Sequence, residues 1–230
     1  MKVVITGASR GLGKAMAIQF ALAGYELCLV ARNKELLSNL QEELLPTTHA
    51  TLIIADLSHK EDTKAAAQKI LSQFGVPDIL INNAGTFLPG SVSEEEEGVL
   101  ESMLQNNLMS AYHFTRALLP AMKDRHSGHI FNMCSIASLQ AYSNGGSYSI
   151  SKFALLGFSK NLREELKPHQ IKVTAIMPGA VYTDSWAGSG VDPQRIMESE
   201  DIAKMVLAMS QLSPQACVED IVIRPQLGDL

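Results

Sequence analysis

The sequence predicts an α/β fold: a doubly wound parallel sheet of about seven strands with helices on both faces. Short apolar runs alternate with longer segments of helical periodicity along the whole chain. Uninterrupted apolar runs are typical of parallel strands that are buried on both faces. The 230 residues, 46% of them hydrophobic, are enough for one sizeable core, so we expect a single domain over residues 1–230.

The first part of the chain supplies four strands and three helices. Each expected strand is an apolar run, at 3–5, 27–30, 51–55 and 79–81. The expected helices lie between these runs, over 11–23, 33–45 and 59–74. Gly24, Pro46 and Gly75 follow the three helices directly, and both residue types commonly end helices. This alternation predicts right-handed crossovers between neighbouring parallel strands.

The second part continues the alternation with longer helices. The expected order is a helix over 94–123, a strand over 130–133, a helix over 148–166, a strand over 171–176, a loop over 179–193, a helix over 200–212 and a strand over 221–223. Ser93 and Glu96 fit a capping box at the start of the first of these helices. The acidic run 94–97 also suits the positive end of a helix dipole.

Charge and residue usage exclude several classes of protein. The 19 basic and 24 acidic residues give a net charge of −5, which opposes binding to nucleic acids and to anionic membranes. No apolar segment is long enough to span a bilayer. The three cysteines and six histidines lack the spacing of a disulfide framework or a metal site, so we expect no metal. Because no leader-like segment precedes the first apolar run, we expect a cytoplasmic protein.

A glycine-rich loop joins the first strand to the first helix. Its glycines, Gly7, Gly11 and Gly13, are spaced Gly-x-x-x-Gly-x-Gly. Glycines there let the backbone approach a phosphate, and the helix start supplies N–H donors. The alternative is a tight turn that needs glycine only for its backbone conformation. The spacing differs from the Gly-x-Gly-x-x-Gly of the commoner dinucleotide fingerprint, and we interpret the loop as a phosphate-binding loop.

Two further motifs lie where ligands bind in such sheets. Asn82-Asn83-Ala84-Gly85 follows the fourth strand and could border an adenine ribose, or it could be a turn-forming cluster. Tyr148 and Lys152 are four positions apart on a predicted helix and therefore share a face. A neighbouring ammonium lowers the pKa of a phenol, which suits a general acid. Ser135, at the end of the fifth strand, could donate a hydrogen bond to the same carbonyl oxygen, or be structural.

These motifs occur in one order, together with Pro178-Gly179, and the chain thereby resembles the short-chain dehydrogenase/reductase family over essentially its whole length. The resemblance implies that Tyr148 is the catalytic acid, that Ser135 binds the substrate carbonyl, and that Lys152 lowers the Tyr148 pKa and holds the nicotinamide ribose. Asn107 matches the asparagine that keeps a water for proton relay, and Asn106 beside it is the alternative.

The resemblance and the charge pattern together give a set of expected cofactor-binding residues. They are Gly7, Ser9, Arg10, Gly11, Leu12, Gly13, Arg32, Asp56, Leu57, Asn83, Ala84, Gly85, Tyr148, Lys152, Pro178, Gly179, Val181 and Thr183. The second strand ends without a carboxylate, which would repel a 2′-phosphate. Arg32 and Arg10 could pair with that phosphate, so we expect NADP(H) rather than NAD(H). The alternative is that both arginines are solvated surface charges.

The expected activity is NADPH-dependent reduction of a small-molecule ketone to a secondary alcohol. The substrate stays open between a 3-oxoacyl thioester and a small dicarbonyl. The C-terminal residues 224–230 resemble those of sepiapterin-reductase-like members, so reduction of a pterin carbonyl is the alternative activity. A dinucleotide-binding regulator without turnover is the alternative from another class. We also expect a homodimer or homotetramer, because the two long helices carry apolar residues on more than one face: Ala111, Phe114, Ala117, Leu118, Phe153, Leu156 and Phe158.

Overall fold

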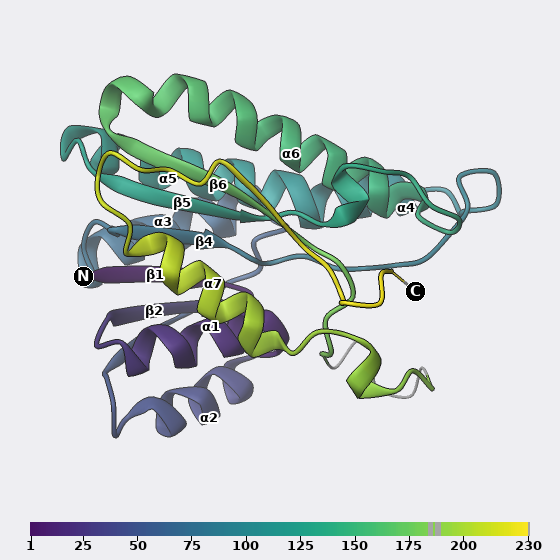
Figure 1. Cartoon of the computed structure of the whole chain (residues 1–230). Helices are drawn as coiled ribbons and strands as arrows, with labels where there is room; N and C mark the ends of the chain where they lie inside the picture. The colour runs from purple at the N-terminus through teal and green to yellow at the C-terminus, as the bar shows by residue number, and fades with distance from the viewer. Residues whose placement is uncertain (184–185, 187–189, 230) are drawn as a thin grey trace.

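The computed structural model describes residues 1–183, 186 and 190–229. Its strands form one seven-stranded parallel sheet in the order β3-β2-β1-β4-β5-β6-β7 (Figure 1). The strands are β1 (Lys2–Thr6), β2 (Glu26–Ala31), β3 (Ala50–Ile54), β4 (Ile79–Asn82), β5 (Gly128–Met133), β6 (Ile171–Pro178) and β7 (Asp220–Ile223). The predicted sheet is confirmed, and its order reverses between β1 and β4.

Helices cover both faces of the sheet, as predicted. They are α1 (Gly11–Leu22), α2 (Lys34–Leu44), α3 (Lys60–Gln73), α4 (Val99–Leu104), α5 (Ser110–Asp124), α6 (Gly146–Leu166) and α7 (Ser199–Ser210). The first two and α7 pack on one face, and α3, α5 and α6 pack on the other (Figure 1). Within the described residues, every helix is too short or too polar to cross a membrane.

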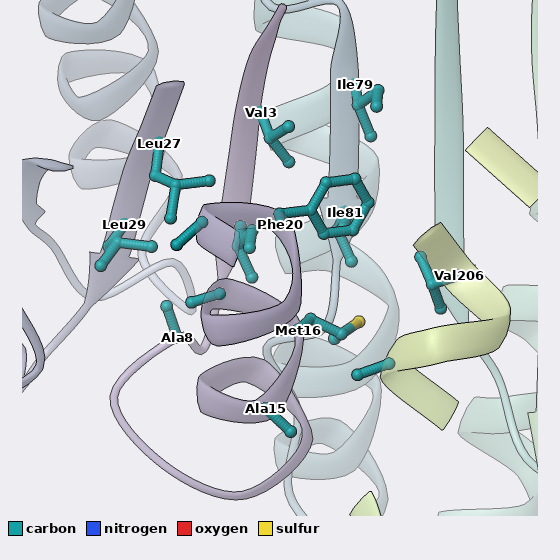
Figure 2. Close-up of a cluster of buried hydrophobic side chains, with 14 of the residues drawn as sticks. Val3, Ala8, Ala15, Met16, Phe20, Leu27, Leu29, Ile79, Ile81 and Val206 are labelled. Carbon is teal, nitrogen blue, oxygen red and sulfur yellow. The ribbon is translucent and has the colours of Figure 1, made fainter. Parts of the chain in front are cut away.

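The central strands are mostly apolar because both of their faces are buried. Val3 and Ile5 of β1 belong to the core under α1 and α7, whereas Val4 between them belongs to the core under α3 and α5. Figure 2 shows Phe20 and Met16 of α1 among side chains of β1, β2 and β4, with Val206 of α7 beside Met16. This packing fixes α1 against β1, so the loop between them has a defined shape.

The predicted helix over 94–123 is wrong at its start. Residues 94–98 are not helical, and helix α4 begins at Val99 after Gly98, whose φ is +90°. The expected capping box is absent, because the Ser93 hydroxyl bonds that of Ser91 instead. The helical stretch is also divided, since a π-helix (Gln105–Met109) separates α4 from α5. The left-handed Gly98 explains the late start, because an α-helix requires negative φ values.

Most of the apolar residues that suggested a subunit interface are core residues. Phe114 and Leu118 of α5 are fully buried against the sheet and α3, and Leu156 of α6 is also buried. Phe153 differs, because its side chain is 45% exposed. These buried residues pack within one subunit and therefore do not support an oligomer, contrary to what the sequence had suggested. The oligomeric state stays a prediction.

Candidate active site

The predicted site residues gather at one edge of the sheet, where the parallel strands end. The glycine-rich loop follows β1, Arg32 follows β2, and Asp56 follows β3. The Asn83–Gly85 segment follows β4, and Ser135 follows β5. Ligands of open α/β sheets bind at this edge, next to the point where the strand order reverses. Here that point lies between β1 and β4, which brings the glycine-rich loop beside Asn83.

The glycine-rich loop leaves no room for side chains at two positions. Gly7 has a φ of +64°, and a Cβ there would lie 2.9 Å from the Cα of Ala84. A Cβ on Gly13 would lie only 2.2 Å from the Gly7 carbonyl oxygen. The Arg10 side chain makes no capping hydrogen bond to the start of α1. The first turn of α1 therefore presents its N–H groups without that cap, as anion-binding helix starts do.

Thr6 and Asn83 join the ends of β1 and β4. The Thr6 hydroxyl accepts hydrogen bonds from the backbone N–H groups of Asn83 and Ala84, at 2.9 Å each. In return, the Asn83 amide donates to the carbonyl oxygens of Thr6 and Gly7, at 3.0 and 3.2 Å. Thr6 was not among the predicted site residues. The signal that could have identified it is a hydroxyl side chain at the last position of the strand, directly before Gly7. These bonds hold the shape of the cleft at the switch point.

Arg32 and Asp56 meet at the far end of the same edge. Their closest charged atoms, Arg32 Nη1 and Asp56 Oδ2, are 3.6 Å apart, and the Arg32 side chain is 62% exposed. Partial burial acts to raise the pKa of Asp56, but hydrogen bonds from Ser58 and the charges of Arg32 and His59 outweigh it and lower the pKa. Arg32 is thus a surface cation beside the cleft. Leu57 follows Asp56 in the chain, but its side chain is buried in the core and does not lie at the surface as Arg32 does.

Ser135 is fixed by a short 3-10 helix (Ile136–Ser138) directly after β5. Its hydroxyl accepts a hydrogen bond from the N–H of Ala137 at 3.1 Å. Its own N–H donates to the Ser138 hydroxyl at 3.2 Å. This reciprocal capping box holds the Ser135 backbone in place. Ser135 is buried, and its hydroxyl hydrogen-bonds the Tyr148 phenol.

Tyr148 and Lys152 lie on the first turns of α6. The Tyr148 ring packs edge-on against Phe87, with ring centroids 4.9 Å apart. Burial raises the pKa of the Tyr148 phenol, and the hydrogen bond with Ser135 offsets this rise only in part. Burial also lowers the pKa of Lys152 to about 8, and its ammonium donates to the Met133 carbonyl at 2.8 Å. The expected lowering of the Tyr148 pKa is therefore wrong for this structure, because burial dominates.

Asn107 lies in the π-helix, and its side chain points into the site. The buried amide accepts from the N–H of Thr86 at 2.7 Å and donates to the Ser151 hydroxyl at 2.9 Å. Ser151 in turn donates to the Tyr148 carbonyl oxygen at 2.7 Å. Asn106 instead is half-buried, and its amide donates to the Ser102 carbonyl oxygen at 2.8 Å. π-Helical turns often occur at functional sites. Only Asn107 of the two is therefore placed beside the tyrosine and lysine.

The segment after β6 runs beside the start of α1. The Gly179 N–H donates to the Ile223 carbonyl at 2.8 Å, and Val181 forms a parallel bridge with Met197. A Cβ on Gly11 would lie 3.4 Å from the Thr183 methyl carbon, so this segment reaches the glycine-rich loop. The predicted loop over 179–193 lies partly outside the described residues, namely at 184–185 and 187–189.

A doubly wound sheet with a glycine-rich loop at its switch point defines the Rossmann class. Comparison with known proteins narrows this class. The sequence model for the short chain dehydrogenase family matches residues 1–193. The chain therefore belongs to the short-chain dehydrogenase family, whose members are oxidoreductases that use nicotinamide cofactors. The predicted family and enzyme class are confirmed.

Individual relatives are similar over nearly their whole length. A sepiapterin reductase of Chlorobaculum tepidum is 32% identical, with 99% of this chain and 97% of the relative covered. An alcohol dehydrogenase of Thermococcus sibiricus, solved with 5-hydroxy-NADP, is 28% identical with a TM-score of 0.90, and the match covers 98% and 96% of the chains. An L-sorbose reductase of Gluconobacter frateurii, solved with NADPH and L-sorbose, is 27% identical with a TM-score of 0.90, over 96% and 94%.

Proposed function

We propose that residues 1–230 form one catalytic domain that reduces a ketone to a secondary alcohol with NADPH. The observation that carries this proposal is the convergence of Tyr148, Ser135 and Lys152 at the cleft edge of the sheet, beside the glycine-rich loop. The relatives solved with NADP-type cofactors support the choice of cofactor. The presence of Ser135, Tyr148 and Lys152 together favours an enzyme over a dinucleotide-binding regulator without turnover.

The residues at the cleft fit a dinucleotide. Gly7 and Gly13 let the loop turn tightly against Ala84 and its own backbone, and a pyrophosphate would bind the N–H groups at the start of α1. Arg32 and Arg10 would hold the 2′-phosphate, and Lys152 the nicotinamide ribose. The other proposed cofactor contacts are Ser9, Gly11, Leu12, Asp56, Leu57, Asn83, Ala84, Gly85, Tyr148, Pro178, Gly179, Val181 and Thr183. When bound, the reduced nicotinamide supplies the hydride.

The side chains of the site supply the proton and stabilise the developing charge. Tyr148 donates its phenolic proton to the carbonyl oxygen of the substrate, while Ser135 donates a hydrogen bond to that oxygen. The raised pKa of Tyr148 keeps the phenol protonated at neutral pH, which suits the reductive direction. Asn107, held by Thr86 and Ser151, keeps the water through which Tyr148 is reprotonated.

A substrate panel tests the proposed activity. NADPH oxidation would be followed by absorbance with sepiapterin, L-sorbose, small 1,2-diketones, quinones and 3-oxoacyl thioesters. The first two follow from the names of the relatives. We expect turnover with at least one ketone class and formation of the matching alcohol. NADPH binding without turnover of any panel member would instead favour the dinucleotide-binding regulator.

Arg32 is expected to select NADPH over NADH. Because charge-assisted hydrogen bonds contribute about 1.5–3 kcal/mol, Arg32→Ala should lower the ratio of kcat/KM values for NADPH and NADH at least about tenfold. Lys34→Ala, which removes another exposed cation two positions away, is the matched control and should leave the ratio unchanged. A wild-type preference for NADH, or an unchanged ratio in Arg32→Ala, would rule out this role.

We also propose a homodimer or homotetramer that pairs the outer face of α6 with its copy. Ile150 and Phe153 support this, because they are 41% and 45% exposed on that helix. Burial of such side chains between subunits removes apolar surface from water. Sedimentation at micromolar concentration is expected to show a multiple of the 24.9 kDa chain mass. A single species at 24.9 kDa would contradict the proposal.

A further inference from the structure

The carboxylate of Glu95 binds the start of α6, the helix that carries Tyr148. In the run of four glutamates at 94–97, Glu95 is half-buried, whereas the other three are exposed. Its Oε1 atom accepts a hydrogen bond from the Ser147 N–H at 2.9 Å, and its Oε2 atom accepts one from the Ser147 hydroxyl. A negative charge at this end of a helix is favourable, because the N–H groups there lack partners within the helix.

Two glycines form a cradle for this carboxylate. A Cβ on Gly146 would lie 2.0 Å from Glu95 Oε1, and a Cβ on Gly90 would lie 2.7 Å from the same atom. Gly146 also has a φ of +36°, which side chains rarely adopt. The Gly90 N–H donates to the Asn144 carbonyl at 3.0 Å. The loop after β4 and the segment before α6 are therefore both shaped around the Glu95 carboxylate.

The same loop after β4 also contacts the Tyr148 side chain. Phe87, which lies in that loop, packs edge-on against the Tyr148 ring at a centroid distance of 4.9 Å. Ser147, the partner of Glu95, directly precedes Tyr148 in the chain. The backbone before Tyr148 and the ring of Tyr148 are thus held by one loop, through Glu95 and Phe87.

We propose that Glu95 is a positioning residue for Tyr148. It ties the loop after β4 to the first turn of α6 and thereby sets where the phenol meets the substrate carbonyl. This inference rests on the proposed function, because the residue that Glu95 positions, Tyr148, is the proton donor of that reaction. A displacement of about 1 Å at a catalytic group can lower a rate by about 10²-fold. A cap that only stabilised α6 would lower the unfolding temperature and leave kcat unchanged.

The test is a double-mutant cycle of Glu95→Ala and Tyr148→Phe. Turnover would be measured with whichever ketone of the panel the wild type reduces, below the unfolding temperature of every variant. We expect Glu95→Ala to lower kcat about 10- to 100-fold, with the Kd for NADPH within about twofold of the wild type because the cofactor contacts remain. In the Tyr148→Phe background, Glu95→Ala should have no further effect on kcat.

Glu94→Ala and Glu96→Ala are the matched controls, since these neighbours are exposed, and both should keep wild-type kcat. Hydrogen exchange of the protein without cofactor gives a second readout. The amide of Ser147 should exchange faster in Glu95→Ala, because it loses its acceptor. If Glu95→Ala fails to fold, Glu95→Gln takes its place. It keeps one oxygen for the Ser147 N–H, and we expect a smaller fall in kcat from it.

The outcomes separate the positioning role from the proposed function. A wild-type kcat in the Glu95 variant would overturn the positioning role alone. So would a double variant whose loss of kcat equals the product of the losses in Glu95→Ala and Tyr148→Phe. A wild-type kcat in Tyr148→Phe would overturn the proposed function as well. A fall in kcat that is absent in the Tyr148→Phe background and in the neighbouring glutamate variants would support the inference.

Discussion

Replacement of Tyr148 by phenylalanine is expected to lower kcat by about 10²- to 10⁴-fold, the usual contribution of a positioned general acid. The change removes the transferable proton and the hydrogen bond with Ser135, and it keeps the ring. The phenyl ring can keep the edge-on packing against Phe87, and the backbone bonds of α6 do not involve the hydroxyl. The Kd for NADPH should therefore stay close to the wild-type value.

Steady-state kcat and the NADPH Kd, measured by quenching or transfer of fluorescence, check this expectation. Tyr142→Phe is the matched control, because it makes the same chemical change six positions earlier. Tyr142 is 45% exposed, and burial raises its pKa to about 12, so its hydroxyl is also protonated at neutral pH. We expect wild-type turnover from this control. Near-normal kcat in Tyr148→Phe would make Tyr148 structural and the mechanism wrong.

The sequence was sufficient for the sheet and for the order of the motifs along its edge. Parallel strands that are buried on both faces are apolar over most of their length, as at 3–5 in β1 and 79–81 in β4, so their sequences are visible as short apolar runs. The glycine-rich loop could be placed because it follows such a run directly. Strand ends then gather at one edge by topology alone, without knowledge of any side-chain contact.

Contacts between distant segments could not be predicted from local patterns. Ser93 and Glu96 have the spacing of a capping box, yet Glu95 beside them caps α6, 52 positions further along the chain. The sequence also could not decide which of the adjacent residues Asn106 and Asn107 belongs to the site, because the π-helical turn determines which amide points inward. The i,i+4 spacing placed Tyr148 and Lys152 on one helix face, but a spacing does not indicate how deeply either side chain is buried. Burial raises the pKa of Tyr148 and lowers that of Lys152.

Lys152→Met is expected to lower kcat/KM for the reduction and to weaken NADPH binding. The methionine keeps most of the side-chain volume in this buried position and removes the ammonium. Loss of charge-assisted hydrogen bonds worth about 1.5–3 kcal/mol corresponds to a fall of about 10- to 150-fold. Lys160→Met is the matched control on α6, because Lys160 is 62% exposed and pairs with Asp220 at the surface.

The lowered pKa of Lys152 also predicts a pH dependence with a definite sign. Burial lowers this pKa to about 8, so the folded protein loses the ammonium as the pH rises through that value. Since kcat/KM reports the ionisation of the free enzyme, it should fall above about pH 8 in the wild type and stay flat in Lys152→Met. Measurements from pH 7 upward avoid titration of the cofactor 2′-phosphate, whose second pKa is about 6. Tyr148, with its raised pKa, would still be protonated over the first part of this range. A fall near pH 8 that persists in Lys152→Met would assign it to another group and remove Lys152 from the mechanism.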